Sequence, residues 1–327
     1  MRRRCMLPWS TVARNFNTTS KDFNAVKDPA ELFFNPDVQA RLKTLTGRDE
    51  NRIFNPKKLG KRLSSPKYEF MTKAQLEEAL KDSQKKMDIK LQMPPLLSAR
   101  QEINEVITAD PELKGLDDSK FVFTDISLGV PERKRLVVVR DPEGTLRKAT
   151  WEERERMLQI YFPRPGREIL PPPMFNEDNL KRLLEKKSYI FILDRACAQF
   201  EPDDPQYIHV TRDTYSHIEK HEDFDLLWST RHYGPMVLYL TIEKRIDSLI
   251  KTLLMNLKRE DIADLIQLYN FVHHGFSLTT TVEDDMALLK EYIEKDSLKR
   301  HQLELALQSY QEYLKQNQEI EKSRVSA

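Results

Sequence analysis

The sequence is poor in glycine and cysteine, and it has no long apolar run. Only 8 of its 327 residues are glycine, which disfavours Gly-rich nucleotide-binding folds, because those folds need glycine where the backbone approaches a phosphate. Two cysteines, Cys5 and Cys197, cannot form a disulfide framework or a zinc site by themselves, which fits a reducing interior. The longest apolar stretches, such as residues 236–240, fall far short of the roughly 20 residues that cross a bilayer.

Acidic residues are absent from positions 1–20, which contain four Arg and five Ser or Thr. This composition is typical of a mitochondrial transit peptide, and no apolar run follows the arginines as it would in a secretory signal. We therefore predict a transit peptide over residues 1–20, removed near residues 14–22. The alternative is a disordered basic tail.

The net charge of +1 hides an asymmetry along the chain. Residues 1–100 hold 21 Lys and Arg against 11 Asp and Glu, whereas the rest holds 32 against 41. We interpret residues 21–71 as a basic extended arm that could lie along a phosphate backbone, and the alternative is a solvated basic linker. The candidate phosphate contacts in this arm are Lys57, Lys58, Lys61 and Arg62.

A helix, a small sheet and a second helix are expected over residues 72–173. Thr72 and Gln75 form a capping box before a helix over 73–90, and Thr150 and Glu153 form another before a helix over 151–162. Between these two helices, the spacing of Ile103, Val106 and Ile107 predicts a further short helix around these residues. The remaining segments, 121–130, 135–140 and 145–149, predict a small antiparallel sheet, with a turn at residues 141–144.

Residues 174–327 have helical spacing almost throughout. The proline-rich segment 163–173 marks the boundary before them. We expect one long helix from Pro235 to Leu257 and a continuing helical pattern up to Gly275, followed by two more helices. The predicted fold is therefore mainly α, with a small antiparallel β-sheet or hairpin region followed by a C-terminal, solenoid-like stack of antiparallel helices.

No catalytic constellation emerges, so we predict no enzyme activity, cofactor, metal or small-molecule substrate. His217 and His221 are spaced as metal ligands on a helix, but a zinc hydrolase needs Glu directly after the first His, where Ile218 stands. Ordinary surface histidines are the favoured interpretation, and a metal-dependent hydrolase is the alternative. Cys197 lies in an apolar run and is expected to be a buried structural thiol.

Two further residue groups are candidates for contacts with partners. The first surrounds the predicted hairpin and supplies cations for phosphates: Arg140, Arg147 and Lys148. The second combines residue types that are enriched at interface cores, although Trp228 and Met236 could simply belong to the hydrophobic core. Its members are Trp228, Arg231, Tyr233 and Met236.

An ordered set of fragments over residues 71–315 resembles a known family. It is the family of metazoan mitochondrial small-subunit ribosomal proteins numbered twenty-two, which has no bacterial counterpart. The fragments are MTKAQLEEA (71–79), QMPPLL (92–97), KFVFTDIS (120–127), DPEGTLRKATWEERERMLQIYFP (141–163), AQFEPDDPQYIHV (198–210) and LLWSTRHYGPMVLYL (226–240).

This resemblance implies a structural constituent of the mitochondrial small ribosomal subunit, located in the matrix. Its implied partners are neighbouring mitochondrial small-subunit ribosomal proteins and small-subunit rRNA, and its implied role is the assembly and stability of the particle that translates mitochondrial messages. The residues alone leave another class open, a free helical-repeat adaptor or RNA-processing factor of the matrix. Co-sedimentation with the small subunit separates these hypotheses.

Overall fold

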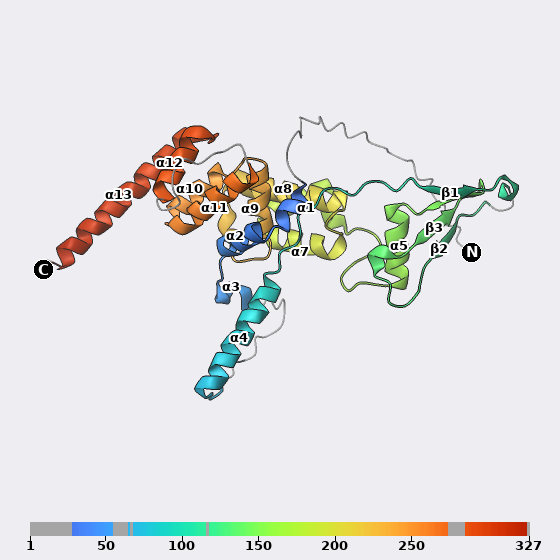
Figure 1. Ribbon diagram of the computed structural model, residues 1–327, viewed down its shortest axis with the longest axis horizontal. Coiled ribbons are helices and arrows are strands. Elements are labelled where there is room, and N and C mark those ends of the chain that lie inside the picture. Colours follow the sequence, from blue (N-terminus) through green and yellow to red (C-terminus); the bar gives the residue numbers. More distant parts are fainter. Residues whose placement is uncertain (1–27, 55–64, 66–67, 116–117, 274–284, 326–327) are drawn as a thin grey trace.

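The computed structural model describes residues 28–54, 65, 68–115, 118–273 and 285–325, and it shows an elongated molecule. A helical body occupies the middle, a small β-sheet with one helix lies at one end, and the last helix extends from the other end (Figure 1). Residues 1–20, the predicted transit peptide, lie outside the described residues.

Three N-terminal helices are part of the helical body. They are α1 (Pro29–Phe33), α2 (Pro36–Thr46) and α3 (Glu50–Phe54). Asn35 caps α2 by accepting hydrogen bonds from the next backbone amides, and Pro36 occupies the first turn. The apolar side of α2 packs against two helices of the C-terminal stack and is buried at Val38, Leu42 and Leu45.

The expectation of an extended arm is therefore wrong for residues 29–54. That expectation was based on the excess of basic residues. A few apolar residues at helical spacing are nevertheless enough to hold a short helix against an existing core. Gly234 makes the approach possible, since a Cβ there would lie 2.1 Å from Met93 Sδ and 3.5 Å from Leu42 Cβ. Arg41 Nη1 also donates to Gln267 Oε1 at 2.6 Å, so the middle of the segment is held against α11 (Arg259–Val272) as well.

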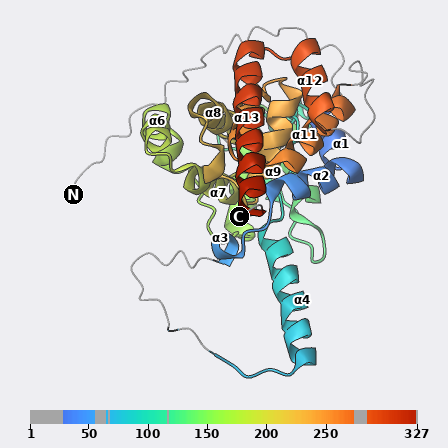
Figure 2. The same cartoon turned by 90° about the vertical axis from the view of Figure 1, so that its left-hand side faces the viewer.

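Helix α4 (Lys73–Lys90) has the predicted bounds and projects away from the body in both views (Figures 1 and 2). The capping box forms as expected, with Thr72 accepting from the Gln75 amide and Gln75 accepting from the Thr72 amide. Met87, near its base, is the one buried residue of the helix. Leu76 and Leu80 are exposed.

Four antiparallel strands form the sheet, in the order β1-β4-β3-β2. Their bounds are β1 Val106–Ala109, β2 Phe121–Thr124, β3 Val137–Arg140 and β4 Thr145–Lys148. The predicted strands are confirmed, but the short helix expected around Ile103, Val106 and Ile107 is wrong, because β1 pairs there with β4. A register shift between Val106 and Thr108 breaks the alternation that would have revealed this strand.

Helix α5 (Trp151–Tyr161) covers one face of this sheet. Its capping box at Thr150 and Glu153 forms as predicted. Met157 packs against Val137 and Val139, which are fully buried on the face toward the helix. The turn before β4 places Gly144 at φ +88°, with an added Cβ only 2.0 Å from the Asp110 carbonyl oxygen, so glycine is needed there.

The C-terminal stack confirms the predicted helical architecture. Pairs in contact include α7 with α8, α10 with α13, and α11 with α12. Short 3-10 helices lie at η1 Pro111–Leu113, η2 Glu132–Lys134, η3 Pro173–Phe175 and η4 Phe224–Leu226. The α-helices are α6 Glu177–Glu185, α7 Tyr189–Gln199, α8 Pro205–His221, α9 Tyr233–Ile242, α10 Asp247–Met255, α11 Arg259–Val272, α12 Asp285–Lys295 and α13 Arg300–Val325.

The single helix expected from Pro235 to Leu257 is in fact two helices, α9 and α10. The chain turns at Lys244, which has φ +57° although it is not glycine. Its amide donates to the Thr241 carbonyl at 3.1 Å, and the Arg245 amide donates to the Leu240 carbonyl at 2.8 Å. These two bonds form a Schellman motif, which ends a helix by satisfying its last carbonyls. Gly275, the expected end of the next helix, lies outside the described residues, and α11 ends at Val272.

Candidate protein and RNA interfaces

The cations predicted for the arm, Lys57, Lys58, Lys61 and Arg62, lie outside the described residues. Their contact with RNA phosphates stays a prediction.

Arg147, one of the three hairpin cations, is held by two carboxylates. Its Nε lies 2.7 Å from Asp141 Oδ2, and its Nη1 and Nη2 lie 2.8 and 2.9 Å from the two oxygens of Glu153. Lys120 Nζ lies 3.6 Å from Asp141. Glu153 thus joins β4 to the first turn of α5 in addition to capping it, so the surroundings of Arg147 favour a structural role.

The Arg147 guanidinium lowers the pKa of Glu153 to about 2, because its hydrogen bonds stabilise the ionised carboxyl. A carboxyl with a depressed folded-state pKa stabilises the fold above its unfolded-state pKa of about 4.3 and loses that contribution as pH falls towards 2. We therefore expect Glu153→Gln to flatten the pH dependence of the free energy of unfolding between about pH 5 and pH 2. Glutamine retains the capping bond, so urea denaturation at several pH values isolates the ion pair. An unchanged profile would contradict this assignment.

Lys148 and Arg140 have different environments. Lys148 Nζ forms an ion pair with Glu105 Oε2 at 2.6 Å, and both side chains are exposed. Arg140 lies half-buried on the sheet face away from α5, and its buried Nε has no hydrogen-bond partner among the described residues. Phosphate contacts by the three hairpin cations stay a prediction, but only Arg140 lacks a carboxylate partner in the described part of the chain.

The second predicted group does not form one surface. Tyr233 and Met236 are buried on α9 within the hydrophobic core, where a partner protein does not reach them, so their assignment to an interface is corrected to the core. Trp228 also packs against the core, with Lys258 Nζ 3.8 Å from its ring centroid. Arg231 is part-exposed, and its Nη2 pairs with Asp194 Oδ1 at 2.7 Å.

His217 and His221, the two histidines spaced like metal ligands, lie one turn apart on α8. Their rings stack with centroids 4.1 Å apart, and His217 Nδ1 lies 3.0 Å from the Tyr189 hydroxyl. Within the described ranges, no group of three or more His, Cys, Asp and Glu side chains could hold a metal ion, and none of the helices is long and apolar enough to cross a membrane. Burial raises the pKa of the Cys197 thiol, which therefore lacks the activation expected of a nucleophile.

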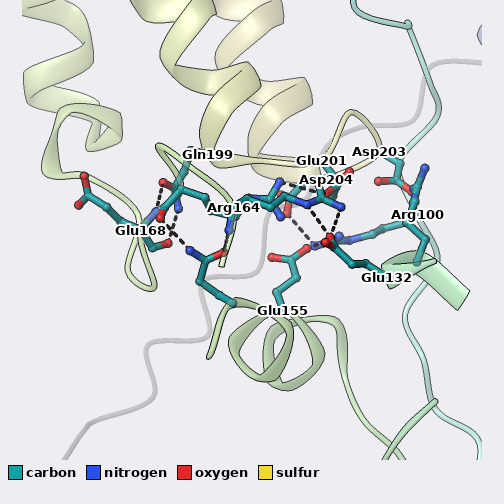
Figure 3. A network of polar contacts seen from close by, with 12 residues as sticks. Arg100, Glu132, Glu155, Arg164, Glu168, Gln199, Glu201, Asp203 and Asp204 are labelled. Carbon is teal, nitrogen blue, oxygen red and sulfur yellow. Dashed lines mark hydrogen bonds and ion pairs between the residues drawn. The ribbon is translucent and has the colours of Figure 1, made fainter. Parts of the chain in front are cut away.

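We call strands β1–β4 together with α5 the sheet unit. Sequence reasoning missed a charged network that joins this unit to the helical body (Figure 3). At its centre, Arg100 is only 10% exposed at its side chain and donates to Glu155 on α5 at 2.5 Å and to Asp204 at 2.7 Å. Asp204 is also the N-cap of α8. The Arg100 guanidinium further stacks on Trp151, 4.7 Å from the ring centroid. One arginine therefore contacts both α5 of the sheet unit and the start of α8 in the helical body.

The same network extends along the segment 163–173. Arg164 donates to Glu132 at 2.6 Å and to Glu201 at 2.5 Å, and Arg167 also pairs with Glu201 at 3.0 Å. Gln199 exchanges two hydrogen bonds with the backbone of Glu168, at 2.8 and 3.0 Å. The proline-rich segment is thus fastened on both sides, a feature that sequence spacing alone does not reveal.

Large apolar side chains are exposed on the projecting elements, a second feature that sequence analysis missed. On α4 they are Leu76, Leu80 and Ile89, and on α13 they include Leu305 and Tyr313. Single exposed apolar residues are ordinary, but their concentration on the elements that project furthest is typical of protein interaction surfaces. The exposed large apolar residues on the strands of the sheet unit and their connections are Val106, Ile107, Phe121, Val122, Phe123, Ile126, Leu128 and Leu136.

Comparison with known proteins identifies the family. A family model described as mitochondrial 28S ribosomal protein S22 matches residues 31–274. The small ribosomal subunit protein mS22 of Mus musculus is 41% identical over 291 residues, which cover 88% of this chain and 80% of the relative. The protein of the same name from Bos taurus is 42% identical with the same coverage. This chain therefore belongs to the mitochondrial 28S ribosomal protein S22 family.

Proposed function

We propose that this chain is a structural scaffold of the mitochondrial small ribosomal subunit in the matrix, holding neighbouring proteins and rRNA together without catalysing a reaction. The observation that carries the proposal, beyond family membership, is the exposure of large apolar side chains on three projecting elements: α4, α13 and the sheet unit. A partner that covers these side chains removes apolar area from water, which favours assembly. The helical body supplies the rigid core between them.

We assign the protein contacts to these projecting elements. We assign the RNA contact to residues 57–62, called the basic segment below. Lys57, Lys58, Lys61 and Arg62 supply four positive charges within six residues. Neutralising phosphates with such a cluster releases counterions, which gives affinity without sequence specificity. Arg147 and Lys148 already have carboxylate partners, so the basic segment is the stronger candidate for rRNA.

Sedimentation of a matrix lysate on a sucrose gradient tests this proposal. The chain should co-sediment with the small ribosomal subunit, and depletion of the chain should lower the amount of assembled small subunit. Recovery of the chain only in the light fractions would contradict the proposal and would favour a free adaptor or RNA-processing factor. A particle that assembles and translates normally without the chain would also contradict it.

Replacing Lys57, Lys58, Lys61 and Arg62 together with glutamine tests the RNA contact. If all four neutralise rRNA phosphates, the slope of log affinity against log salt should become shallower by about three. Release of the chain from purified small subunits at increasing salt measures this change. The matched control neutralises four exposed cations of α4, Lys73, Lys81, Lys85 and Lys86, and it should alter the slope less. Equal slopes for both variants would place the RNA contact elsewhere.

A further inference from the structure

In the part of the chain that the structure describes, α5 covers one face of the sheet and no element covers the other. Strand pairing opposes Phe121 to Arg140, Phe123 to Val138, and Arg140 to Leu146, and directly opposed residues lie on the same side of a sheet. Leu136 precedes Val138 by two residues and shares its side by alternation. Lys148 opposes Val138 and therefore shares this side as well. We call these seven residues the outer sheet face: Phe121, Phe123, Leu136, Val138, Arg140, Leu146 and Lys148.

The two faces differ in burial along β3, although Val122, which opposes Val139 on the inner side, is 37% exposed. On the inner face Val137 and Val139 are buried beneath α5. On the outer face Phe121 is 46% exposed, Phe123 53% and Leu136 52%. Five of its seven residues are apolar, so its exposure in the isolated chain is unfavourable and its burial against a partner is favourable.

Arg140 adds a specific chemical requirement to this face. It is half-buried in the middle of the face, between Phe121 on β2 and Leu146 on β4. In the described part of the chain its buried Nε has no hydrogen-bond partner, and its guanidinium forms no ion pair among those found. Arg147, by contrast, is paired with two carboxylates on the inner side. A half-buried guanidinium surrounded by apolar side chains is best satisfied by a carboxylate, which it can bind through two parallel hydrogen bonds.

We propose that an amphipathic helix of a neighbouring protein in the small subunit covers the outer sheet face, with its apolar side on Phe121, Phe123 and Val138 and an Asp or Glu on Arg140. The inference rests on the proposed function, because it needs the chain to be assembled in the particle. It makes the sheet the middle layer between α5 and the partner's helix.

The dimensions of the face suit one helix. Strands β2, β3 and β4 span about 10 Å between the axes of the outer two, and four residues of strand are about 13 Å long. A helix with its side chains is about 10–12 Å wide and rises about 5.4 Å per turn. Two to three turns therefore cover the face. A long strand added at the edge of β2 would leave Val138, Arg140 and Leu146 uncovered.

An RNA strand fits this face less well than a protein. Aromatic rings on a sheet can stack bases, but such platforms are accompanied by several cations that follow the phosphates. Here the seven-residue face carries two cations, Arg140 and Lys148, and Lys148 is already paired with Glu105. The composition of two Phe, three aliphatic residues, one Arg and one paired Lys instead matches a protein interface with an apolar centre.

Site-specific photo-crosslinking in assembled small subunits tests the proposal. A photoreactive phenylalanine at position 123 should form an adduct with one small-subunit protein, and mass spectrometry should place the adduct in a helical sequence with an apolar stripe and an Asp or Glu. An adduct with rRNA would overturn the proposal, and so would the absence of any protein adduct. Because the measurement uses chain that has already co-sedimented with the particle, such a failure leaves the proposed function intact.

Charge reversal tests the role of Arg140 separately. Arg140→Glu should lower incorporation into the small subunit about tenfold or more in competition with the unchanged chain, because two carboxylates would then face each other. Lys134→Glu makes the same change in charge at an exposed residue off the face and should have little effect. Changing the acidic residue of the crosslinked helix to Lys should restore incorporation of the Arg140→Glu chain. Equal incorporation of both charge-reversal variants, or no restoration, would overturn the assignment of Arg140.

Discussion

Replacing Arg100 with alanine should lower the free energy of unfolding by about 3–5 kcal/mol, the cost of leaving buried charges without their partner. Arg100 is 10% exposed at its side chain and bonds both Glu155 and Asp204. Burial already raises the pKa of Glu155 despite the opposing effect of Arg100, so removal of the guanidinium should favour the neutral acid further. The sheet unit should then loosen from the helical body.

Trp151 provides a local measurement of this change, because Arg100 stacks on its ring and the Trp151 indole donates to the Gln101 carbonyl at 2.7 Å. Because Trp9 and Trp228 also fluoresce, both are changed to Phe in every variant compared. Urea denaturation followed by the fluorescence of Trp151 should then shift to lower urea in Arg100→Ala. The control is Arg133→Ala, which removes a partner of Asp203 at a residue whose side chain is 54% exposed and should cost less than about 1 kcal/mol. Equal shifts for both variants would show that the network does not fasten the two parts.

Helix starts could be predicted from sequence because their chemistry is local. Thr72 and Thr150 each accept a hydrogen bond from the backbone amide three residues ahead, as their capping-box sequences predict. These caps require no tertiary contact. They therefore place the starts of α4 and α5 correctly.

Helix ends are harder to predict because four of the described helices end without a glycine. The ends of α6, α8, α9 and α10 carry a left-handed residue and the two hydrogen bonds of a Schellman motif. With only 8 glycines in the chain, the sequence gives no sign of these turns, so the break between α9 and α10 was missed. The four left-handed residues are Lys187, Glu222, Lys244 and Leu257.

Residue type identified candidate sites but not the partner of each side chain. Arg147 was correctly placed beside the hairpin, yet its ion pair with Glu153 depends on how α5 packs against β4. Met236 suits both a protein interface and a core, and only the surrounding helices decide for the core. The Arg100 network was missed because its charged residues come from segments more than 50 residues apart in the chain.

Replacing Leu42 with alanine should cost about 2–5 kcal/mol, the range for a buried leucine whose cavity is only partly refilled. Leu42 is fully buried on α2, and this helix packs against α9 and α11. If residues 29–54 were a loosely held basic arm, the same substitution would have almost no effect. The matched control is Leu305→Ala on α13, where the side chain is 65% exposed and the expected change is within about 0.5 kcal/mol. Thermal unfolding followed by circular dichroism compares the two variants directly. A Leu42→Ala melting temperature equal to that of Leu305→Ala would show that α2 is peripheral, whereas a drop of several degrees would show that the N-terminal helices complete the core of the C-terminal stack.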